Sequence, residues 1–208
     1  MKDDIRCVAH PLVVGITGGI GSGKSYVAHL LQDHLHVPVY DSDTEAKKIT
    51  ATHPFVRESL QKLVGNHVYA TDGTLQKTVL AEFLFSDDRN AAQVNAIIHP
   101  VVKQHFAQWI QQQSAPIVAI ESAILYESGF NKLVHRVLFV DAPTEVRLQR
   151  AMRRDGADAR QIKARMDRQQ TLQYKNEADW VLQNESVSDT QLLQQLTKFV
   201  AEATQQQK

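Results

Sequence analysis

The sequence predicts an α/β fold, in which buried parallel strands alternate with helices. Short apolar runs that are typical of such strands recur along the chain. They span residues 12–17, 37–40, 116–121, 136–141 and 178–182. Segments with helical spacing of apolar residues separate these runs, and a last amphipathic helix with Leu192, Leu196 and Val200 should cover the sheet. With 208 residues, the chain suits one such domain with insertions.

A glycine-rich loop follows the first strand. Residues 18–25 read Gly-Gly-Ile-Gly-Ser-Gly-Lys-Ser, which fits the phosphate-loop pattern. Its backbone N–H groups, with the N-terminus of the next helix, would surround nucleotide phosphates. Lys24 would reach the β- and γ-phosphates, and the Ser25 hydroxyl would bind Mg2+. The alternative is a flexible turn, but the strand before the loop and the helical spacing after it favour a phosphate site.

Acidic residues stand at the carboxyl ends of two predicted strands. Asp41 and Asp43 follow the second strand, and Glu121 ends the third. In open parallel sheets ligands bind at these ends, so the acids should lie beside the loop. An N-cap would account for only one acid of the Asp41/Asp43 pair. Glu121 would hold a water of the Mg2+ shell or lie near the reacting hydroxyl. The alternative is a surface charge on a loop, but an acid directly after a mostly apolar run favours the sheet edge that faces the ligand.

Residues 50–114 contain no convincing strand and several amphipathic helical stripes. An insertion of this length exceeds an ordinary loop and predicts a substrate-facing helical subdomain. Within it, Asp72-Gly73 marks a turn. His99-Pro100 is interpreted as the break between two helices, because a residue before proline avoids the helical region. A ligand contact by His99 stays open beside that interpretation.

A second excursion, residues 146–175, is rich in arginine. Arg147, Arg150 and Arg154 fall on one face of a predicted helix, and Asp155-Gly156 offers a reversal point. A helical lid that places arginines on phosphates needs this pattern. The alternatives are a solvated charged face and a nucleic-acid patch, but few aromatic residues accompany the cations to stack bases.

Composition limits the remaining function classes. Lys plus Arg and Asp plus Glu number 23 each, so no net charge favours nucleic acid as a partner. Cys7 is the single cysteine, which excludes an internal disulfide and suits a reducing cytoplasm. Neither a signal peptide nor a membrane-spanning run is evident. We expect a cytosolic protein without a membrane partner, and the oligomeric state stays open.

Taken together, the motifs resemble those of the dephospho-coenzyme A kinase family. The resemblance spans residues 12–184, in the family's order and spacing. Beside the loop, it rests on these matches: Asp41-Ser42-Asp43, Phe85-Ser86-Asp87, His99-Pro100, Leu125-Tyr126-Glu127-Ser128-Gly129, Arg150, Arg154-Asp155-Gly156, Arg165, Gln169, Lys175, Ala178-Asp179 and Asn184. The chain departs from the family at Tyr26 for threonine, Lys77 for arginine, Ala123 for proline and Glu121 for aspartate.

The resemblance implies ATP-dependent phosphorylation of the ribose 3′-hydroxyl of dephospho-coenzyme A, with Mg2+ as cofactor. It implies a phosphate-loop three-layer sandwich with a five-stranded parallel sheet. Residues 10–49, 115–145 and 176–208 would form the nucleotide-binding core, residues 50–114 a helical coenzyme A domain and residues 146–175 the lid. Nucleoside monophosphate and shikimate kinases share the logic of loop and lid, but they would not predict the context of Asp43, His99 and Ala178-Asp179. A regulatory GTPase is disfavoured because Leu133-Val134 follows Asn131-Lys132 where a guanine-selecting motif needs aspartate.

The loop, the strand-end acids and the resemblance together predict the site residues. Catalysis is assigned to Asp43 as the base, to Lys24 and to Arg154. ATP binding is assigned to Gly18, Gly21, Ser22, Gly23, Lys24, Ser25, Tyr26, Arg150 and Asn184, the last beside adenine. Acceptor binding is assigned to Asp43, Lys77, His99 and Glu121. Metal binding is assigned to Ser25 and, through water, Glu121.

Overall fold

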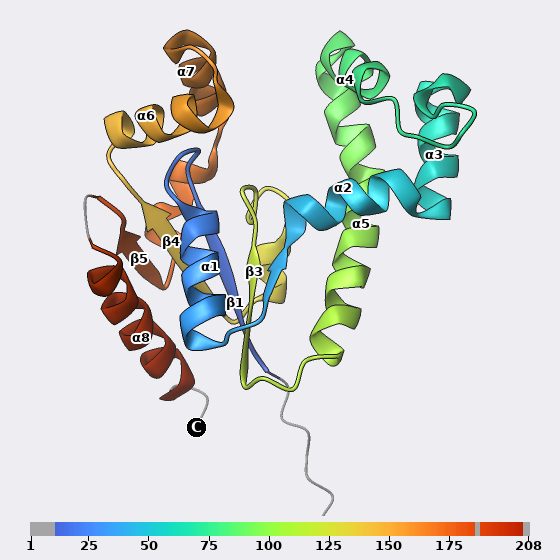
Figure 1. Cartoon of the computed structure of the whole chain (residues 1–208). Coiled ribbons are helices and arrows are strands. Elements are labelled where there is room, and N and C mark those ends of the chain that lie inside the picture. The colour runs from blue at the N-terminus through green and yellow to red at the C-terminus, as the bar shows by residue number, and fades with distance from the viewer. Residues whose placement is uncertain (1–10, 186–187, 206–208) are drawn as a thin grey trace, which may run out of the picture. The chain divides into compact units, whose positions relative to one another are not determined.

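The computed structural model describes residues 11–185 and 188–205 and contains a five-stranded parallel sheet with helices (Figure 1). The expectations for Cys7 and the first ten residues lie outside the described residues. The strands are β1 (Leu12–Gly18), β2 (Val39–Asp41), β3 (Ile117–Glu121), β4 (Arg136–Asp141) and β5 (Trp180–Gln183). Their order in the sheet is β2-β3-β1-β4-β5, so the α/β fold class is confirmed.

The register of the central strands brings their carboxyl ends to one edge of the sheet. β1 is buried along its whole length and pairs in parallel with both β3 and β4. Ile16 lies opposite Glu121, and Gly18 lies opposite Val140. Because parallel strands present these ends together, the glycine loop after β1 and the acid at the end of β3 share one edge.

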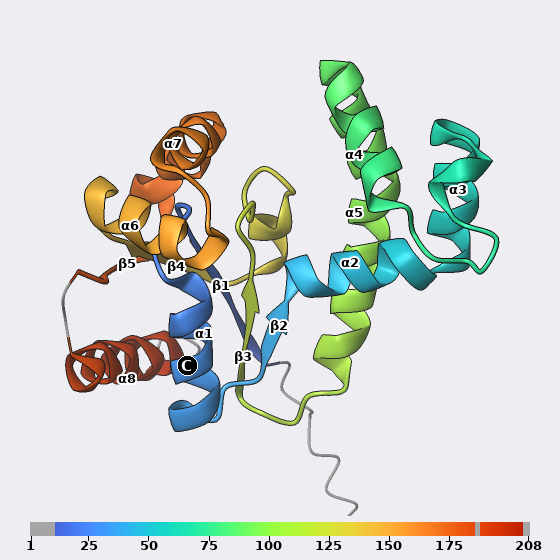
Figure 2. The same ribbon diagram turned by 45° about the horizontal axis from the view of Figure 1, so that its top comes forward.

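Two helices cover one face of the sheet. α1 (Lys24–Leu35) and α8 (Asp189–Gln205) lie side by side over the strands (Figures 1 and 2). Their buried residues, among them Leu31 and Leu196, form one apolar cluster with Ile16 of β1 and Leu138 of β4. On Gly15 of β1 a side chain would collide with Leu125, so the segment after β3 packs closely against the sheet.

The arginine-rich segment forms two short helices. α6 (Thr144–Asp155) and α7 (Ala159–Arg168) are joined through Gly156, which has a left-handed φ of 62°. The predicted reversal is therefore confirmed, since glycine adopts this conformation without strain. A small cluster of Leu148, Ala151, Ile162 and Met166 holds the pair together. The 3-10 segment η3 (Thr171–Glu177) then leads to β5.

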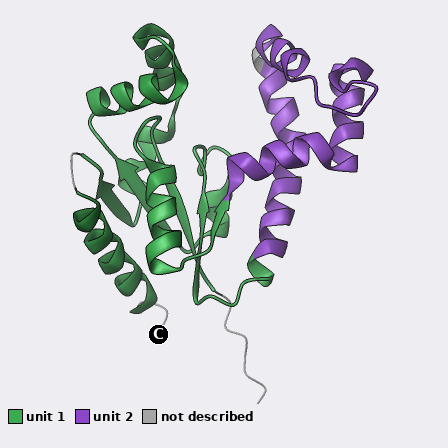
Figure 3. Ribbon diagram, viewed as in Figure 1, with its two compact units in different colours: residues 1–40, 110–208 green, residues 41–109 purple. Residues whose placement is uncertain are grey.

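The chain divides into two compact units (Figure 3). Unit 1 comprises residues 1–40 and 110–208, and unit 2 comprises residues 41–109. Unit 2 is helical, as its amphipathic stripes predicted. Its elements are α2 (Ser42–Thr52), α3 (Pro54–Val64), η1 (Asn66–Val68), α4 (Lys77–Ser86) and most of α5 (Asp88–Gln111). By this division α2 belongs to the helical unit, whereas the sequence boundary lay at residue 50.

The interpretation of His99-Pro100 as a helix break was wrong. α5 runs from Asp88 to Gln111 without interruption and carries Pro100 inside it. Proline removes one backbone donor and disfavours the helical region for the residue before it. The apolar face formed by Val94, Val102 and Phe106 is buried along this helix. Its burial compensates for the local cost of proline, which the two-residue pattern could not indicate.

No helix within the described ranges is both long enough and apolar enough to cross a bilayer.

The predicted turn at Asp72-Gly73 is confirmed. Gly73 has a φ of 86°, and the Asp72 carboxylate accepts a hydrogen bond from the Thr74 N–H at 2.9 Å. This side-chain bond stabilises the turn that precedes α4.

Candidate active site

The glycine loop after β1 passes very close to two other segments of unit 1. Gly21 has a φ of 76°, and a Cβ there would lie 2.1 Å from the Arg147 carbonyl oxygen. Gly23 has a φ of 95°, and a Cβ there would lie 2.2 Å from the Asn184 amide nitrogen. Both positions therefore require glycine for backbone conformation and for space.

The two polar residues that end the motif begin α1. Lys24 Nζ donates to the carbonyl oxygen of Gly19 at 3.4 Å, which folds the lysine side chain back over the loop. Ser25 Oγ donates to Glu121 Oε1 at 2.8 Å. This contact agrees with the prediction from sequence that Glu121 faces the loop. The alternative was a surface charge away from the loop.

One pocket combines the loop with the arginine-rich helix. It is lined by loop residues, by the first turn of α1 and by α6. The lining residues are Gly21, Gly23, Lys24, Ser25, Tyr26, Arg150, Ala151 and Arg154. Six of the predicted ATP-binding residues and the predicted catalytic Arg154 thus come together in unit 1. Gly18 and Ser22 belong to the same loop, and Ser22 is buried.

Three predicted ATP contacts are engaged with the protein itself. Tyr26 donates its hydroxyl to Asp189 Oδ1 at 2.5 Å, and this hydrogen bond raises the pKa of the tyrosine. Arg150 Nη1 donates to the carbonyl oxygen of Asn184 at 2.9 Å. Asn184 is 5% exposed, and its Nδ2 donates to the carbonyl oxygen of Ser22 at 2.8 Å.

The three arginines expected on one face of α6 have different surroundings. Arg147 is buried, donates to the carbonyl oxygen of Ala142 at 3.0 Å and has a pKa lowered by burial. Arg154 lies nearer to solvent and forms a pair with Asp155 at 2.7 Å. Arg165 of α7 reaches the same carboxylate at 2.6 Å. These bonds hold the pKa of Asp155 at about 2.

Several polar contacts around the loop involve residues to which the residue-by-residue interpretation gave no role. Gln169, at the end of α7, accepts the N–H of Ile20 at 2.7 Å. Lys175 donates to Asp141 Oδ2 at 2.6 Å, at the carboxyl end of β4. Both residues belong to the motifs that resemble the family, but no local pattern indicates which atoms they contact. Their partners are far away in the sequence.

The other predicted site residues lie in unit 2. Asp41 caps α2 by accepting the Thr44 N–H at 2.9 Å, while Asp43 stands exposed in the first turn of that helix. Lys77 is exposed at the first position of α4. His99 is half-buried in α5, and its burial, together with the charge of Lys103, lowers its pKa below 6.5.

The donor set at the loop fits a hard divalent cation that also takes ligands from water and phosphate. Within residues 11–185 and 188–205, no group of three or more His, Cys, Asp or Glu side chains could hold a metal alone. Ser25 and Glu121 offer a hydroxyl and a carboxylate oxygen 2.8 Å apart. Mg2+ usually keeps several waters and binds through few protein oxygens, so this small oxygen set suits it.

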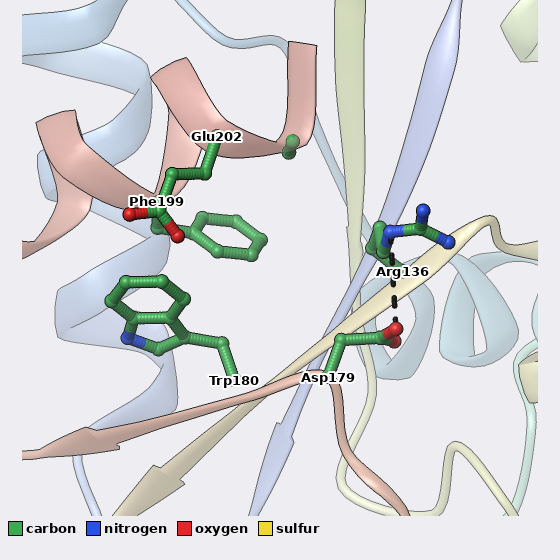
Figure 4. Close-up of a pocket in the computed structure, with 6 residues that line it drawn as sticks. Arg136, Asp179, Trp180, Phe199 and Glu202 are labelled. Atoms are coloured by element: carbon green, nitrogen blue, oxygen red, sulfur yellow. Dashed lines mark ion pairs between the residues drawn. The ribbon is translucent and has the colours of Figure 1, made fainter. Parts of the chain in front are cut away.

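A second pocket lies at the opposite end of β4 and β5 (Figure 4). It is lined by Arg136, Asp179, Trp180, Phe199, Glu202 and Ala203. Arg136 faces Asp179 at 3.8 Å, and the Asp179 Oδ2 accepts the Val137 N–H at 2.8 Å. Trp180 packs edge-on against Phe199. The Trp180–Phe199 contact joins α8 to the start of β5.

A parallel α/β sheet with a phosphate loop, a loop lysine, a serine and carboxylate pair and arginines on a neighbouring helix defines a phosphate-loop kinase. The family model for dephospho-CoA kinase matches residues 12–190. The chain belongs to the dephospho-CoA kinase family.

Individual relatives agree with this assignment. A dephospho-CoA kinase of Bacteroides fragilis strain YCH46 is 47% identical over 190 residues, which cover 90% of this chain and 91% of that protein. A crystal structure of a Thermus thermophilus protein has a TM-score of 0.81 at 33% identity, covering 93% of this chain and 98% of that one. Shikimate kinase from Aquifex aeolicus, with a TM-score of 0.52 and 18% identity over 92% of this chain and 97% of that one, shares the fold.

Proposed function

We propose that this protein transfers the γ-phosphoryl group of ATP to the ribose 3′-hydroxyl of dephospho-coenzyme A, giving coenzyme A and ADP. This is the final step of coenzyme A biosynthesis. The observation that carries the proposal is the phosphate-loop pocket of unit 1 in a chain that matches the dephospho-CoA kinase family over residues 12–190.

Unit 1 supplies the groups that bind and neutralise phosphate. Phosphoryl transfer has a loose transition state, whose charge spreads over the γ-phosphoryl oxygens. The loop N–H groups and Lys24 would bind the β- and γ-phosphates, and Arg154 would reach the transferred group. Ser25, and Glu121 through water, would hold Mg2+, which neutralises phosphate charge when bound. Arg150, Tyr26 and Asn184 would border the nucleotide, with Asn184 beside adenine.

Unit 2 supplies the acceptor side in this proposal. Asp43 would accept the proton of the 3′-hydroxyl, because it is the exposed acid of a pair whose other member caps α2. Lys77 and His99 of this unit, together with Glu121 of unit 1, would contact dephospho-coenzyme A. The lowered pKa of His99 favours its neutral imidazole, so a contact by this residue would be a hydrogen bond at neutral pH.

The domain roles follow from this division. Residues 50–114 would bind the coenzyme A moiety, residues 146–175 would act as a lid, and the remaining core would bind ATP. We further propose that the protein works in the cytoplasm, as its single cysteine suggests. Nucleic acid is not proposed as a partner, since the chain has no net charge.

An acceptor panel tests the proposed reaction. With ATP and Mg2+ fixed, ADP release is measured with dephospho-coenzyme A, AMP, adenosine and shikimate. Dephospho-coenzyme A should react far faster than the others, because binding of its remote pantetheine part positions the 3′-hydroxyl. The product is checked for a 3′-phosphate by mass and by sensitivity to a 3′-nucleotidase. A preference for AMP or shikimate would overturn the proposal.

A further inference from the structure

Two side-chain amides contact the backbone of the phosphate loop. Gln169 Oε1 accepts a hydrogen bond from the N–H of Ile20 at 2.7 Å. Asn184 Nδ2 donates a hydrogen bond to the carbonyl oxygen of Ser22 at 2.8 Å. One amide therefore satisfies a backbone donor of the loop, and the other satisfies a backbone acceptor two residues further on.

The orientation of the Gln169 amide is fixed by its other end. Its Nε2 donates to the carbonyl oxygen of Ala123 at 3.3 Å and to Thr171 Oγ1 at 3.2 Å. Thr171 is fully buried, and its hydroxyl donates to the same Ala123 oxygen at 2.9 Å. Since the nitrogen faces these acceptors, the Gln169 oxygen points to Ile20. The amide thus ties the loop to the segment after β3 and to the start of η3.

The Asn184 amide is held just as firmly on the other side. Asn184 directly follows β5, and the backbone N–H of Asn184 donates to the carbonyl oxygen of Asp141 at 2.8 Å. Arg150 donates to its carbonyl oxygen at 2.9 Å. The amide nitrogen lies where a side chain on Gly23 would collide with it. Asn184 is therefore part of the packing that gives the loop its shape.

These contacts have a consequence for nucleotide binding. A phosphate loop works because its N–H groups point at the anion before the anion arrives. If the loop must first be ordered, the free energy cost of ordering it weakens nucleotide binding. Together with the turn bond from Ser22 N–H to the Gly19 oxygen at 3.0 Å, the two amides fix residues 19–22 through the protein alone.

We infer that Gln169 and Asn184 are positioning residues, which preorganise the phosphate loop for nucleotide phosphates. The inference rests on the proposed function only in taking this loop as the ATP site. It assigns Asn184 a role that does not depend on adenine, and it assigns Gln169 a role at the root of the proposed lid.

The test measures the affinity of the complete protein for MgADP by calorimetry. Misfolded protein lowers the binding stoichiometry there, whereas the cost of ordering the loop appears in the affinity. Gln169→Met keeps the length of the side chain but removes its hydrogen bonds, and Asn184→Asp places a carboxylate against the Ser22 carbonyl. Each should weaken MgADP binding by about tenfold. Gln169→Met leaves the Ile20 N–H without its acceptor, and Asn184→Asp leaves the Ser22 carbonyl facing a carboxylate, with only the long 3.5 Å contact from Arg150 Nη1. The exposed neighbours give matched controls, Gln170→Met and Gln183→Glu, which should bind MgADP as the unmodified protein does.

The variant Gln169→Glu distinguishes the effect of added charge on affinity from the effect of a lost hydrogen bond. This variant adds the same charge as Asn184→Asp but keeps an acceptor for the Ile20 N–H, so it should lose less affinity. Equal losses in the two variants would show that added charge, and not loop geometry, is responsible, and would overturn the inference. Wild-type affinity in both Gln169→Met and Asn184→Asp would also overturn it.

Kinetics distinguish positioning from a general loss of structure. In Gln169→Met the KM for ATP should rise about tenfold, while the KM for dephospho-coenzyme A stays within about twofold. A parallel rise of both constants would contradict the inference. If the unmodified protein bound MgADP without phosphorylating dephospho-coenzyme A, the proposed function would fail, and the MgADP affinities would still decide the role of the amides.

Discussion

Ser25 at the start of α1 donates its hydroxyl to Glu121 at the end of β3, across 2.8 Å. The two residues are 96 positions apart in the chain and meet because β1 and β3 are adjacent in the sheet. Together they place two hard oxygen ligands beside the phosphate loop. This pair gives the proposed Mg2+ site its protein component.

Weakening the Ser25–Glu121 pair should raise the Mg2+ concentration that the reaction requires. Glu121→Gln keeps the size of the side chain but removes its charge, so the Mg2+ concentration for half-maximal rate should rise about tenfold. Glu145→Gln, at an exposed acid on α6, is the control and should leave the metal dependence unchanged. The measurement is initial rate against Mg2+ at saturating ATP. An unchanged metal dependence in Glu121→Gln would remove this acid from the site.

Lys24 should matter for turnover much more than for stability. Because the lysine extends over the loop, Lys24→Ala removes charge neutralisation at the β- and γ-phosphates and should lower kcat by about 10²-fold or more. The melting temperature should change by only about 2 °C, as expected for a side chain outside the core. Lys132→Ala is the exposed control. Near-normal turnover in Lys24→Ala would exclude the loop lysine from catalysis.

Arg154 and Arg153 provide a matched test of the lid. Both are exposed on α6, but only Arg154 lines the phosphate-loop pocket. Arg154→Ala should lower kcat by about 10²-fold or more while changing the KM for ATP less, since an arginine that meets the transferring group acts mainly in the transition state. Arg153→Ala should behave as the unmodified protein. Equal effects in the two variants would indicate a merely solvated charged face.

Asp43 is tested by an isosteric change that cannot accept a proton. Asp43→Asn should reduce kcat by about 10²- to 10⁴-fold, with the KM for dephospho-coenzyme A within about twofold of normal. Asp33→Asn, at an exposed position of α1, serves as the control. If the product were correct and the rate of Asp43→Asn undiminished, Glu121 would become the candidate base.

The pair of arginines around Asp155 predicts an acid-dependent loss of stability. Their hydrogen bonds lower the pKa of Asp155 from 3.8 to about 2, so the folded state favours the carboxylate. This stabilisation is complete above the ordinary pKa and is lost as pH falls from about 4 toward 2. Urea unfolding should therefore show a gap between the unmodified protein and Asp155→Asn at pH 6 that shrinks at pH 3. A gap independent of pH would contradict the assignment.

Local sequence patterns predicted those parts of the site whose conformation is set by residues close together in the chain. Strand β1, the glycine loop and α1 are where the pattern placed them, because an apolar strand, a glycine-rich turn and a helix start each have a local sequence signature. Glu121 was predicted beside the loop because the carboxyl ends of parallel strands share one edge, and its contact with Ser25 agrees with this. The continuous helix through Pro100 was missed, since burial of Val94, Val102 and Phe106 outweighs a local preference.

The sequence by itself determined the fold class, the phosphate loop and the candidate residues Lys24, Ser25 and Glu121. Only the tertiary structure decided that Asn184 donates to Ser22, that Gln169 accepts from Ile20 and that Arg147 is buried while Arg154 meets Asp155. The physical reason is the separation of the partners along the chain. Periodicity and motifs report on neighbours along the chain, whereas these contacts join residues brought together by strand order and by close packing against glycine.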